Sequence, residues 1–257
     1  YDHARALNRV ILSKGPDRMI HRTEAYWRLW ARKENLDLSP LPEPVRRLFM
    51  TSQLIMRTQV DNRGAIIAAN DSDVTHFAGD HYSYCWPRDG ALVAHALVLT
   101  GQSELSRAFF EYCARVAHRN GYFLHKYTPM GQLASSWHPW MIDGKPVLPV
   151  QQDETALVLW ALRQHFEAFK DVEFIKPLYT PLVAQPANWM LEYRDHNGLP
   201  KQSWDLWEER RGVHTFTVAA TIGALKAAAK FADDFGENDR AAAYRDAAQK
   251  MTGALKT

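Results

Sequence analysis

The chain has 257 residues, 46% of them hydrophobic and 23% charged, which is the composition of an ordinary globular protein. With 31 basic and 29 acidic side chains the net charge is +2, so no strong electrostatic field indicates a nucleic-acid or membrane partner. The two cysteines offer neither a disulfide framework nor metal-ligand spacing, and no apolar stretch could span a bilayer, so the composition favours a cytoplasmic protein without a metal.

The N-terminal part is predicted to be helical with one interruption. Helices are expected over three ranges: 2–13, 21–34 and about 43–60. The segment 38–44 contains three prolines, which is typical of a linker. Residues 61–87 are expected to be irregular, with a short strand at 64–69 as one option.

Three later helices are predicted to be apolar nearly all round: 91–99, 156–162 and 218–225. Each precedes a more charged, amphipathic segment: 103–119, 171–194 and 237–255. The middle one contains Pro177, Pro181 and Pro186, so it is expected to be a broken helix. Because a helix without a polar face must be surrounded by protein, this alternation favours the inner and outer helices of an α/α toroid. A simple helical bundle is the alternative.

Charged motifs precede each of the apolar helices. Arg88-Asp89 leads the first, residues 151–154 lead the second, and Glu208-Glu209-Arg210 lies just before the third. In a toroid of helical hairpins the inner helices all begin on the same face. The three motifs are therefore predicted to converge on one pocket.

Glu208 is the best candidate for an acid catalyst. It lies between Trp207 and Glu209, and an apolar wall together with a neighbouring carboxylate would raise its pKa. Cleavage of a glycoside needs such a protonated carboxyl group and a second carboxylate on the other side of the sugar. The alternative is an exposed acidic loop whose charges are balanced by the arginines that follow.

Aromatic residues beside charges indicate a sugar site. Tryptophans accompany charged or polar residues in three clusters: 86–89, 137–140 and 204–209. A pyranose ring has apolar C–H faces that stack on aromatic rings and hydroxyl groups that bind carboxylates and arginines. Arg88-Asp89 could clamp vicinal hydroxyls. It could equally be a helix-terminal aspartate with a surface arginine.

Three segments together resemble glycoside hydrolase family 15, which contains glucoamylases, glucodextranases and some bacterial trehalases. They are YSYCWPRDG at 82–90, QQDETAL at 151–157 and DLWEERRGVHTFT at 205–217. The resemblance runs from about residue 43 to 257 and implies an all-α (α/α)6 barrel, of which the first half to two-thirds is present. Residues 1–42 resemble the helical linker that follows an N-terminal β-sandwich in prokaryotic members.

The resemblance also implies roles for individual residues. Glu208 would be the general acid, and Glu209 would bind substrate hydroxyls. Arg88 and Asp89 would hold the terminal glucose. The pocket would be lined by Tyr82, Trp86, Leu206, Trp207 and, on the leaving-group side, Trp137 or Trp140.

The implied activity is the inverting hydrolysis of terminal α-glucosidic bonds in glucans or oligosaccharides, without a cofactor. A trehalase of the same family and a non-catalytic sugar-binding protein are the alternatives. The family's catalytic base comes from the second half of the barrel, beyond Thr257. The full protein is therefore expected to contain that half and the β-sandwich, and this fragment alone is expected to be inactive.

Overall fold

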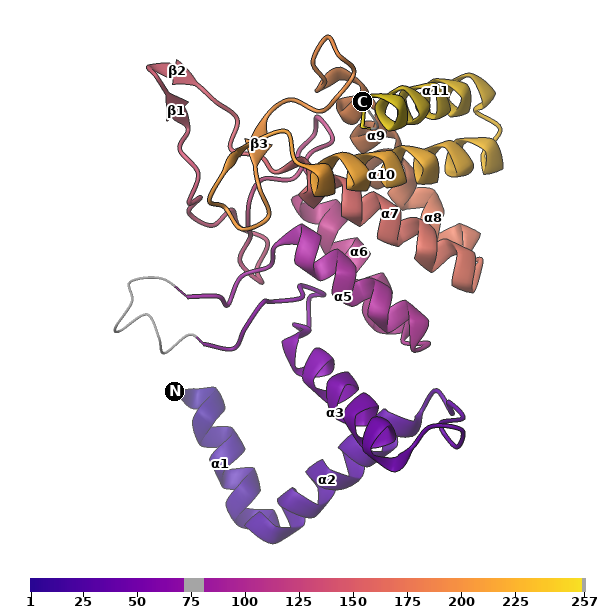
Figure 1. Cartoon of the computed structure of the whole chain (residues 1–257). Helices are drawn as coiled ribbons and strands as arrows, with labels where there is room; N and C mark the ends of the chain where they lie inside the picture. The colour runs from indigo at the N-terminus through magenta and orange to yellow at the C-terminus, as the bar shows by residue number, and fades with distance from the viewer. Residues whose placement is uncertain (72–80, 256–257) are drawn as a thin grey trace. The chain divides into compact units, whose positions relative to one another are not determined.

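A computed structural model of the chain describes residues 1–71 and 81–255 (Figure 1). It divides into two compact units, Tyr1–Thr58 and Gln59–Thr257. Among the helices described, none combines the length and the apolarity needed to cross a membrane.

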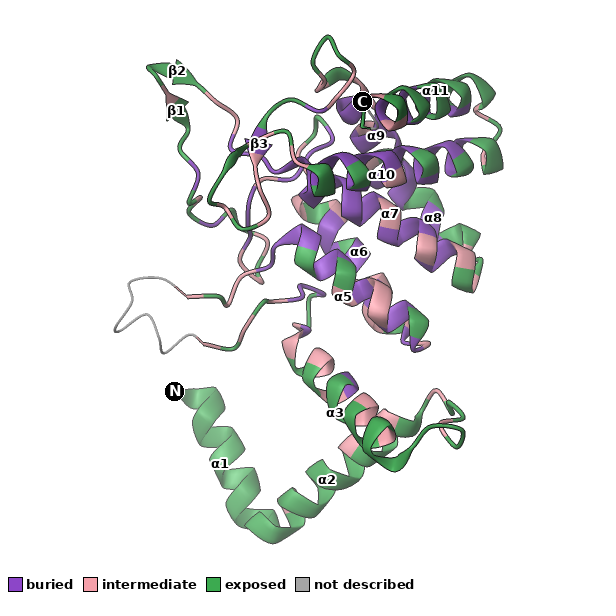
Figure 2. Cartoon of the chain, viewed as in Figure 1, coloured by how far each residue is buried: buried purple, intermediate pink, exposed green. Residues whose placement is uncertain are grey.

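The first unit consists of three helices: α1 (Asp2–Lys14), α2 (Pro16–Arg32) and α3 (Glu43–Gln59). Gly15 separates α1 from α2, because its φ of 84° does not fit a helix and Pro16 then starts a new one. α1 buries no residue, whereas Trp30 of α2 and Gln53 of α3 are buried (Figure 2). The three predicted helices are confirmed, with α2 beginning earlier than expected. The domain boundary at residue 42 stays a prediction.

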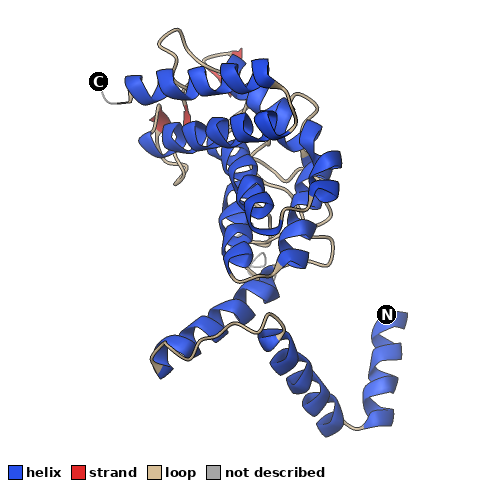
Figure 3. Ribbon diagram, turned by 90° about the vertical axis from the view of Figure 1, so that its right-hand side faces the viewer, coloured by secondary structure: helices blue, strands red, loops and turns tan. Residues whose placement is uncertain are grey.

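The second unit is built from helical hairpins (Figures 1 and 3). Its inner helices are α5 (Pro87–Leu99), α7 (Gln152–Phe169) and α10 (Thr215–Asp234). Its outer helices are α6 (Ser103–Val116), α8 (Val172–Tyr179), α9 (Gln185–Glu192) and α11 (Asn238–Ala254). α7 packs between α5 and α10, and each inner helix contacts outer ones. This is the predicted inner and outer arrangement, part of an all-α barrel.

The proline-rich outer segment is more continuous than expected. A π-helical turn, Thr180–Ala184, joins α8 to α9 without a loop. Pro181 and Pro186 lie at the start of the π-helical turn and of α9, inside one continuous helical run, and neither has the backbone N–H that such a run would use. The wider turn lets the chain stay helical through residues that would otherwise break it.

The strands are short and belong to the loops before the inner helices. β1 (Met141–Ile142) pairs with β2 (Lys145–Pro146), and β3 (Ser203–Trp204) pairs with β4 (Arg211–Gly212), both antiparallel. The predicted strand at 64–69 is wrong, since only an isolated bridge joins Ile66 to Val60 there. The predicted irregular segment 61–87 lies partly outside the described residues.

Burial differs among the three apolar helices. In α7 nearly every residue of the first three turns is buried. Leu92 and Leu99 of α5 are 47% and 71% exposed, and Phe216 of α10 is 40% exposed. Leu92 and Phe216 line a shallow apolar groove with Leu157. The prediction that such helices are surrounded by protein therefore holds for α7 but not for the open side of α5 and α10.

Gly90 allows close packing at the start of α5. A Cβ atom there would lie 2.4 Å from the ring of Phe109, a fully buried residue of α6. We expect Gly90→Ala to lower the free energy of unfolding by about 1–3 kcal/mol, as overpacking does, in urea denaturation. An added Cβ at Gly253 in α11 meets nothing within 4 Å, so Gly253→Ala should be neutral or stabilising. Equal effects of the two substitutions would contradict this account.

Candidate active site

The first turns of the three inner helices are joined by hydrogen bonds. The backbone N–H of Arg88 donates to Glu154 Oε2 at 2.5 Å, and the Arg88 guanidinium donates to Gln151 Oε1 at 2.5 Å and Asp153 Oδ1 at 3.2 Å. Thr217 Oγ1 of α10 donates to Asp153 Oδ2 at 2.6 Å. The predicted convergence of the motifs before α5 and α7 is confirmed, and α10 begins at the same place.

Arg88 neutralises a group of carboxylates. It is 4% exposed, and its nitrogens lie 3.2 Å from oxygens of Asp89, Asp153 and Glu154. Burial raises the pKa of Glu154 well above its ordinary value, although the charge of Arg88 opposes this. Asp153 and Glu154 are fully buried, whereas the side chain of Asp89 is 53% exposed. Asp89 is thus the member of the group that solvent or a ligand can reach.

Glu208 lies in the tight loop between β3 and β4. Asp205 Oδ1 accepts hydrogen bonds from the backbone N–H groups of Glu209 and Arg210, and its carbonyl accepts one from Gln151 Nε2 at 2.6 Å. Glu208 itself has a φ of 64°, a left-handed conformation that is unusual outside glycine. Strain of this kind persists only where the surrounding structure holds it, and it is common at functional sites. The loop is therefore fixed to α7 and presents Glu208 in one orientation.

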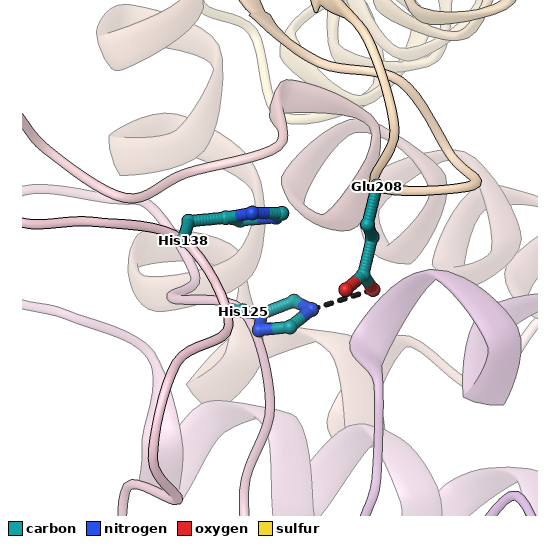
Figure 4. A group of neighbouring side chains, drawn as sticks. All are labelled: His125, His138 and Glu208. Carbon is teal, nitrogen blue, oxygen red and sulfur yellow. Dashed lines mark hydrogen bonds and ion pairs between the residues drawn. The ribbon is translucent and has the colours of Figure 1, made fainter.

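The carboxyl group of Glu208 contacts a buried histidine (Figure 4). Its Oε1 lies 2.6 Å from Nε2 of His125, which is 1% exposed and also accepts a hydrogen bond from the Trp86 indole at 3.1 Å. The His138 ring lies 4.5 Å from that of His125 and stacks on Trp204. His125 was not predicted as a site residue, because it lies in the irregular segment between α6 and α7.

Aromatic rings surround this group. Trp86 lies 5.9 Å from Tyr82 and 5.6 Å from Trp137, measured between ring centroids. The buried Lys126 places its Nζ 3.8 Å from the Trp137 ring centroid. Of the two tryptophans considered for the leaving-group side, Trp137 packs with these rings, although the two are similarly exposed, Trp137 at 43% and Trp140 at 50%. The role predicted for Trp137 remains a prediction.

The residues on either side of Glu208 lie at the surface. Trp207 is 76% exposed and Glu209 is exposed, while Leu206 is half-buried. The predicted apolar wall beside Glu208 is therefore not formed by Trp207. Trp86 and Trp137 contact His125, the residue against which the Glu208 carboxyl group lies.

The charges around Glu208 act against a raised pKa. Burial raises the pKa of Glu208, but the hydrogen bond with His125 and the charge of Arg88 contribute to lowering it below its ordinary value. Burial lowers the pKa of His138 to about 4, which makes its imidazole neutral at neutral pH. The expectation of a raised pKa for Glu208 is therefore wrong.

The position of His125, His138 and Glu208 raises the question of a metal site. Their ligand atoms all lie within 4.8 Å of one another. Both ring nitrogens of His125 face N–H donors, however: the Trp86 indole at 3.1 Å and the Trp137 backbone at 3.5 Å. A metal ligand needs a free lone pair on the coordinating nitrogen. The three residues fit a hydrogen-bonded group better than a metal centre.

Comparison with known proteins points to one family. Residues 47–257 match the family model of Glycosyl hydrolases family 15. The chain is 27% identical to an uncharacterized glycosyl hydrolase of Methanocaldococcus jannaschii over 84% of its length and 32% of the relative's. It is 26% identical to a glucoamylase of a Clostridium species over 78% of its length and 26% of the relative's. The chain thus spans about a third or less of these curated relatives.

Solved structures show the same fold. A bacterial glucoamylase in complex with acarbose superposes with a TM-score of 0.60 at 22% identity, covering 79% of this chain and 27% of that one. At this identity the likeness concerns the fold, which agrees with part of an all-α barrel.

Proposed function

Because the chain belongs to glycosyl hydrolases family 15, we propose that the protein carrying it releases glucose from the ends of α-glucans or oligosaccharides, with Glu208 as the general acid. One observation carries the assignment of the acid. Glu208 is the carboxylate that a strained, pinned loop holds against a buried histidine, at the point where the inner helices begin. The relatives named glucoamylase support the substrate class.

The proposed reaction is a single displacement with inversion. Glu208 gives its proton to the glycosidic oxygen as the bond from that oxygen to the sugar C1 breaks, and the leaving group departs as an alcohol. A water attacks C1 from the opposite face, activated by a second carboxylate roughly 6.5–9.5 Å from the first. We assign that second role to no residue of the described chain.

We further propose that the exposed and half-exposed groups around Glu208 bind the terminal sugar. Asp89, held by Arg88, would accept hydrogen bonds from hydroxyl groups, and the ring of Trp137, supported by the buried Trp86, would pack against the C–H faces. The remaining proposed contacts come from Tyr82, Leu206, Trp207 and Glu209.

The proposed function is tested by incubating the protein that carries this chain with maltose, isomaltose or trehalose. We expect glucose to be released, and to appear first as the β-anomer in ¹H NMR because the α-linkage is inverted. Preference for trehalose would identify the alternative substrate of the family. Initial release of α-glucose, or no release from any of the three, would overturn the proposal.

Asp89→Asn is expected to weaken the binding of acarbose by at least roughly tenfold in isothermal titration calorimetry. A lost charge-assisted hydrogen bond costs about 1.5–3 kcal/mol, and about 1.4 kcal/mol corresponds to a factor of ten. Asp239 likewise lies in the first turn of a helix, α11, and is exposed, so Asp239→Asn is the matched control and should leave affinity unchanged. Unchanged affinity in Asp89→Asn would reduce Asp89 to a helix-terminus contact.

A further inference from the structure

Gln151 occupies the N-cap position of α7 but does not cap the helix. A side chain at this position normally accepts a hydrogen bond from a backbone N–H of the first turn, and serine, threonine, aspartate and asparagine are preferred there. In the part of the chain that the structure describes, the Gln151 side chain makes no such bond, although the residue is fully buried. Its polar atoms therefore serve contacts outside α7.

Two partners fix the orientation of the Gln151 amide. Its Oε1 accepts a hydrogen bond from Arg88 Nη1 at 2.5 Å, and its Nε2 donates one to the backbone carbonyl of Asp205 at 2.6 Å. A guanidinium can only donate and a carbonyl can only accept, so exchanging the amide oxygen and nitrogen would make both contacts repulsive. An ionised carboxylate in place of the amide could bind Arg88 but not the carbonyl. The neutral amide satisfies both partners at once.

The two partners of Gln151 belong to different parts of the proposed site. Arg88 lies 3.2 Å from Asp89, the carboxylate proposed to bind the terminal sugar. The carbonyl of Asp205 also accepts a hydrogen bond from the backbone N–H of Glu208 at 2.9 Å. One buried side chain therefore lies between the residue that orients the sugar-binding carboxylate and the turn that carries the proposed acid.

The turn at residues 205–210 combines internal bonds with this external one. Asp205 Oδ1 accepts hydrogen bonds from the backbone N–H groups of Glu209 and Arg210, which shape the turn itself. Glu208 has a φ of 64°, and a left-handed conformation of this kind persists only where the surrounding structure holds it. The bond from Gln151 attaches the turn to α7, whose first turns are almost completely buried. Without that bond the turn would be less firmly held against the helix ends.

On the basis of the proposed function, we propose that Gln151 is a positioning residue that fixes the general acid relative to the bound terminal sugar. Arg88 and Asp89 set where the sugar lies, and the Gln151 amide holds the Asp205 turn, and with it Glu208, at a fixed place relative to them. Proton transfer to the glycosidic oxygen requires hydrogen-bond reach, so a displacement of about 1 Å is costly. Gln151 acts through Asp205 and neither gains nor loses a proton.

Gln151→Met should lower kcat on maltose by roughly 10–100-fold and change KM by less than about threefold. Methionine fills a similar volume but cannot donate to the Asp205 carbonyl, whereas Asp153 and Glu154 still hold Arg88. The loss should be several times smaller on p-nitrophenyl α-glucoside, because its leaving group needs less protonation. A residue that only stabilises the fold would lower both rates by the same factor, and that result would overturn the proposal.

A double substitution tests whether Gln151 acts through the acid. Once Glu208 has been replaced by glutamine, the position of that side chain no longer affects proton transfer. In the Glu208→Gln background, Gln151→Met should therefore lower the remaining kcat on maltose by less than about threefold. Full additivity of the two separate losses would show that Gln151 acts independently of Glu208 and would contradict the proposal.

Gln152→Met is the matched control. Gln152 is the next residue, is 2% exposed, and donates from Nε2 to the backbone carbonyl of Lys201 at 2.8 Å, outside the turn that carries the acid. Any loss in this variant should be equal on the two substrates. Should Gln151→Met fail to fold, Gln151→Asn keeps an amide that is one methylene too short to span Arg88 and Asp205. It should show the same dependence on the leaving group.

Amide hydrogen exchange, followed by NMR, tests the same inference without activity. We expect the backbone N–H groups of residues 208–210 to exchange roughly tenfold faster in Gln151→Met than in the unaltered protein, and at the unaltered rate in Gln152→Met. Equal exchange in the unaltered protein and both variants would overturn the proposal. A protein that hydrolyses no glucoside but shows this selective loss of protection would contradict the proposed function alone.

Discussion

Glu208→Gln is expected to lower kcat by about 10²–10⁴-fold, the usual worth of general acid catalysis, with little change in KM. Glutamine keeps the shape of the side chain and can occupy the same loop conformation. Its amide has no proton that it can transfer to a glycosidic oxygen, so only the transition state loses stabilisation. Steady-state hydrolysis of maltose by the protein carrying this chain measures the effect.

The control for this substitution is another glutamate in the same unit. Glu111 is exposed on α6, so Glu111→Gln should leave kcat and KM unchanged. A substrate with a good leaving group, such as p-nitrophenyl α-glucoside, should lose less activity in Glu208→Gln, because its departure needs less protonation. Near-normal turnover of maltose by Glu208→Gln would remove Glu208 from the mechanism.

The sequence could predict where the inner helices meet but not the contacts made there. Arg88, Glu154 and Glu208 were expected near one another because each belongs to a motif before an apolar helix, and the inner helices of a toroid all begin on the same face. That expectation depends only on hydrophobic periodicity. Periodicity predicts nothing about His125, because His125 lies in a segment without regular structure. Its contact with Glu208 depends on how two loops fold over the helix ends.

The surroundings of Glu208 could not be predicted from the residues next to it in the sequence. Trp207 was expected to supply an apolar wall, but the left-handed conformation at Glu208 turns the two side chains apart, one outward and one toward the site. A tight turn breaks the relation between adjacent side chains that a strand or helix would keep. Trp86 and Trp137 instead pack around His125, the partner of Glu208, and their positions follow from tertiary packing.

Arg88→Met is expected to lower the free energy of unfolding by about 3–5 kcal/mol, the cost of leaving buried charges without a partner. Asp153 and Glu154 are fully buried, and Arg88 is the cation that pairs with both. Methionine fills much of the same volume, so the loss reports charge more than packing. Urea denaturation measures it, and Arg245→Met, which breaks an exposed pair with Asp233, should cost at most about 1 kcal/mol.

The loss should also depend on pH, with a sign that follows from Glu154. Burial already raises its pKa above the unfolded value, and the charge of Arg88 opposes this rise, so removing Arg88 raises the folded pKa further. A carboxyl group with a raised folded pKa favours the folded state at low pH, and that stability is lost as pH rises. The deficit of Arg88→Met should therefore be smaller at pH 5 than at pH 8. In the Arg88→Met background, the second substitution Glu154→Gln should restore part of the free energy of unfolding at pH 8, because one uncompensated buried charge is removed. If Arg88→Met lowered the free energy of unfolding no more than Arg245→Met at both pH values, Arg88 would not neutralise this group. Buried carboxylates without a cation should destabilise the protein by more than the loss of an exposed ion pair.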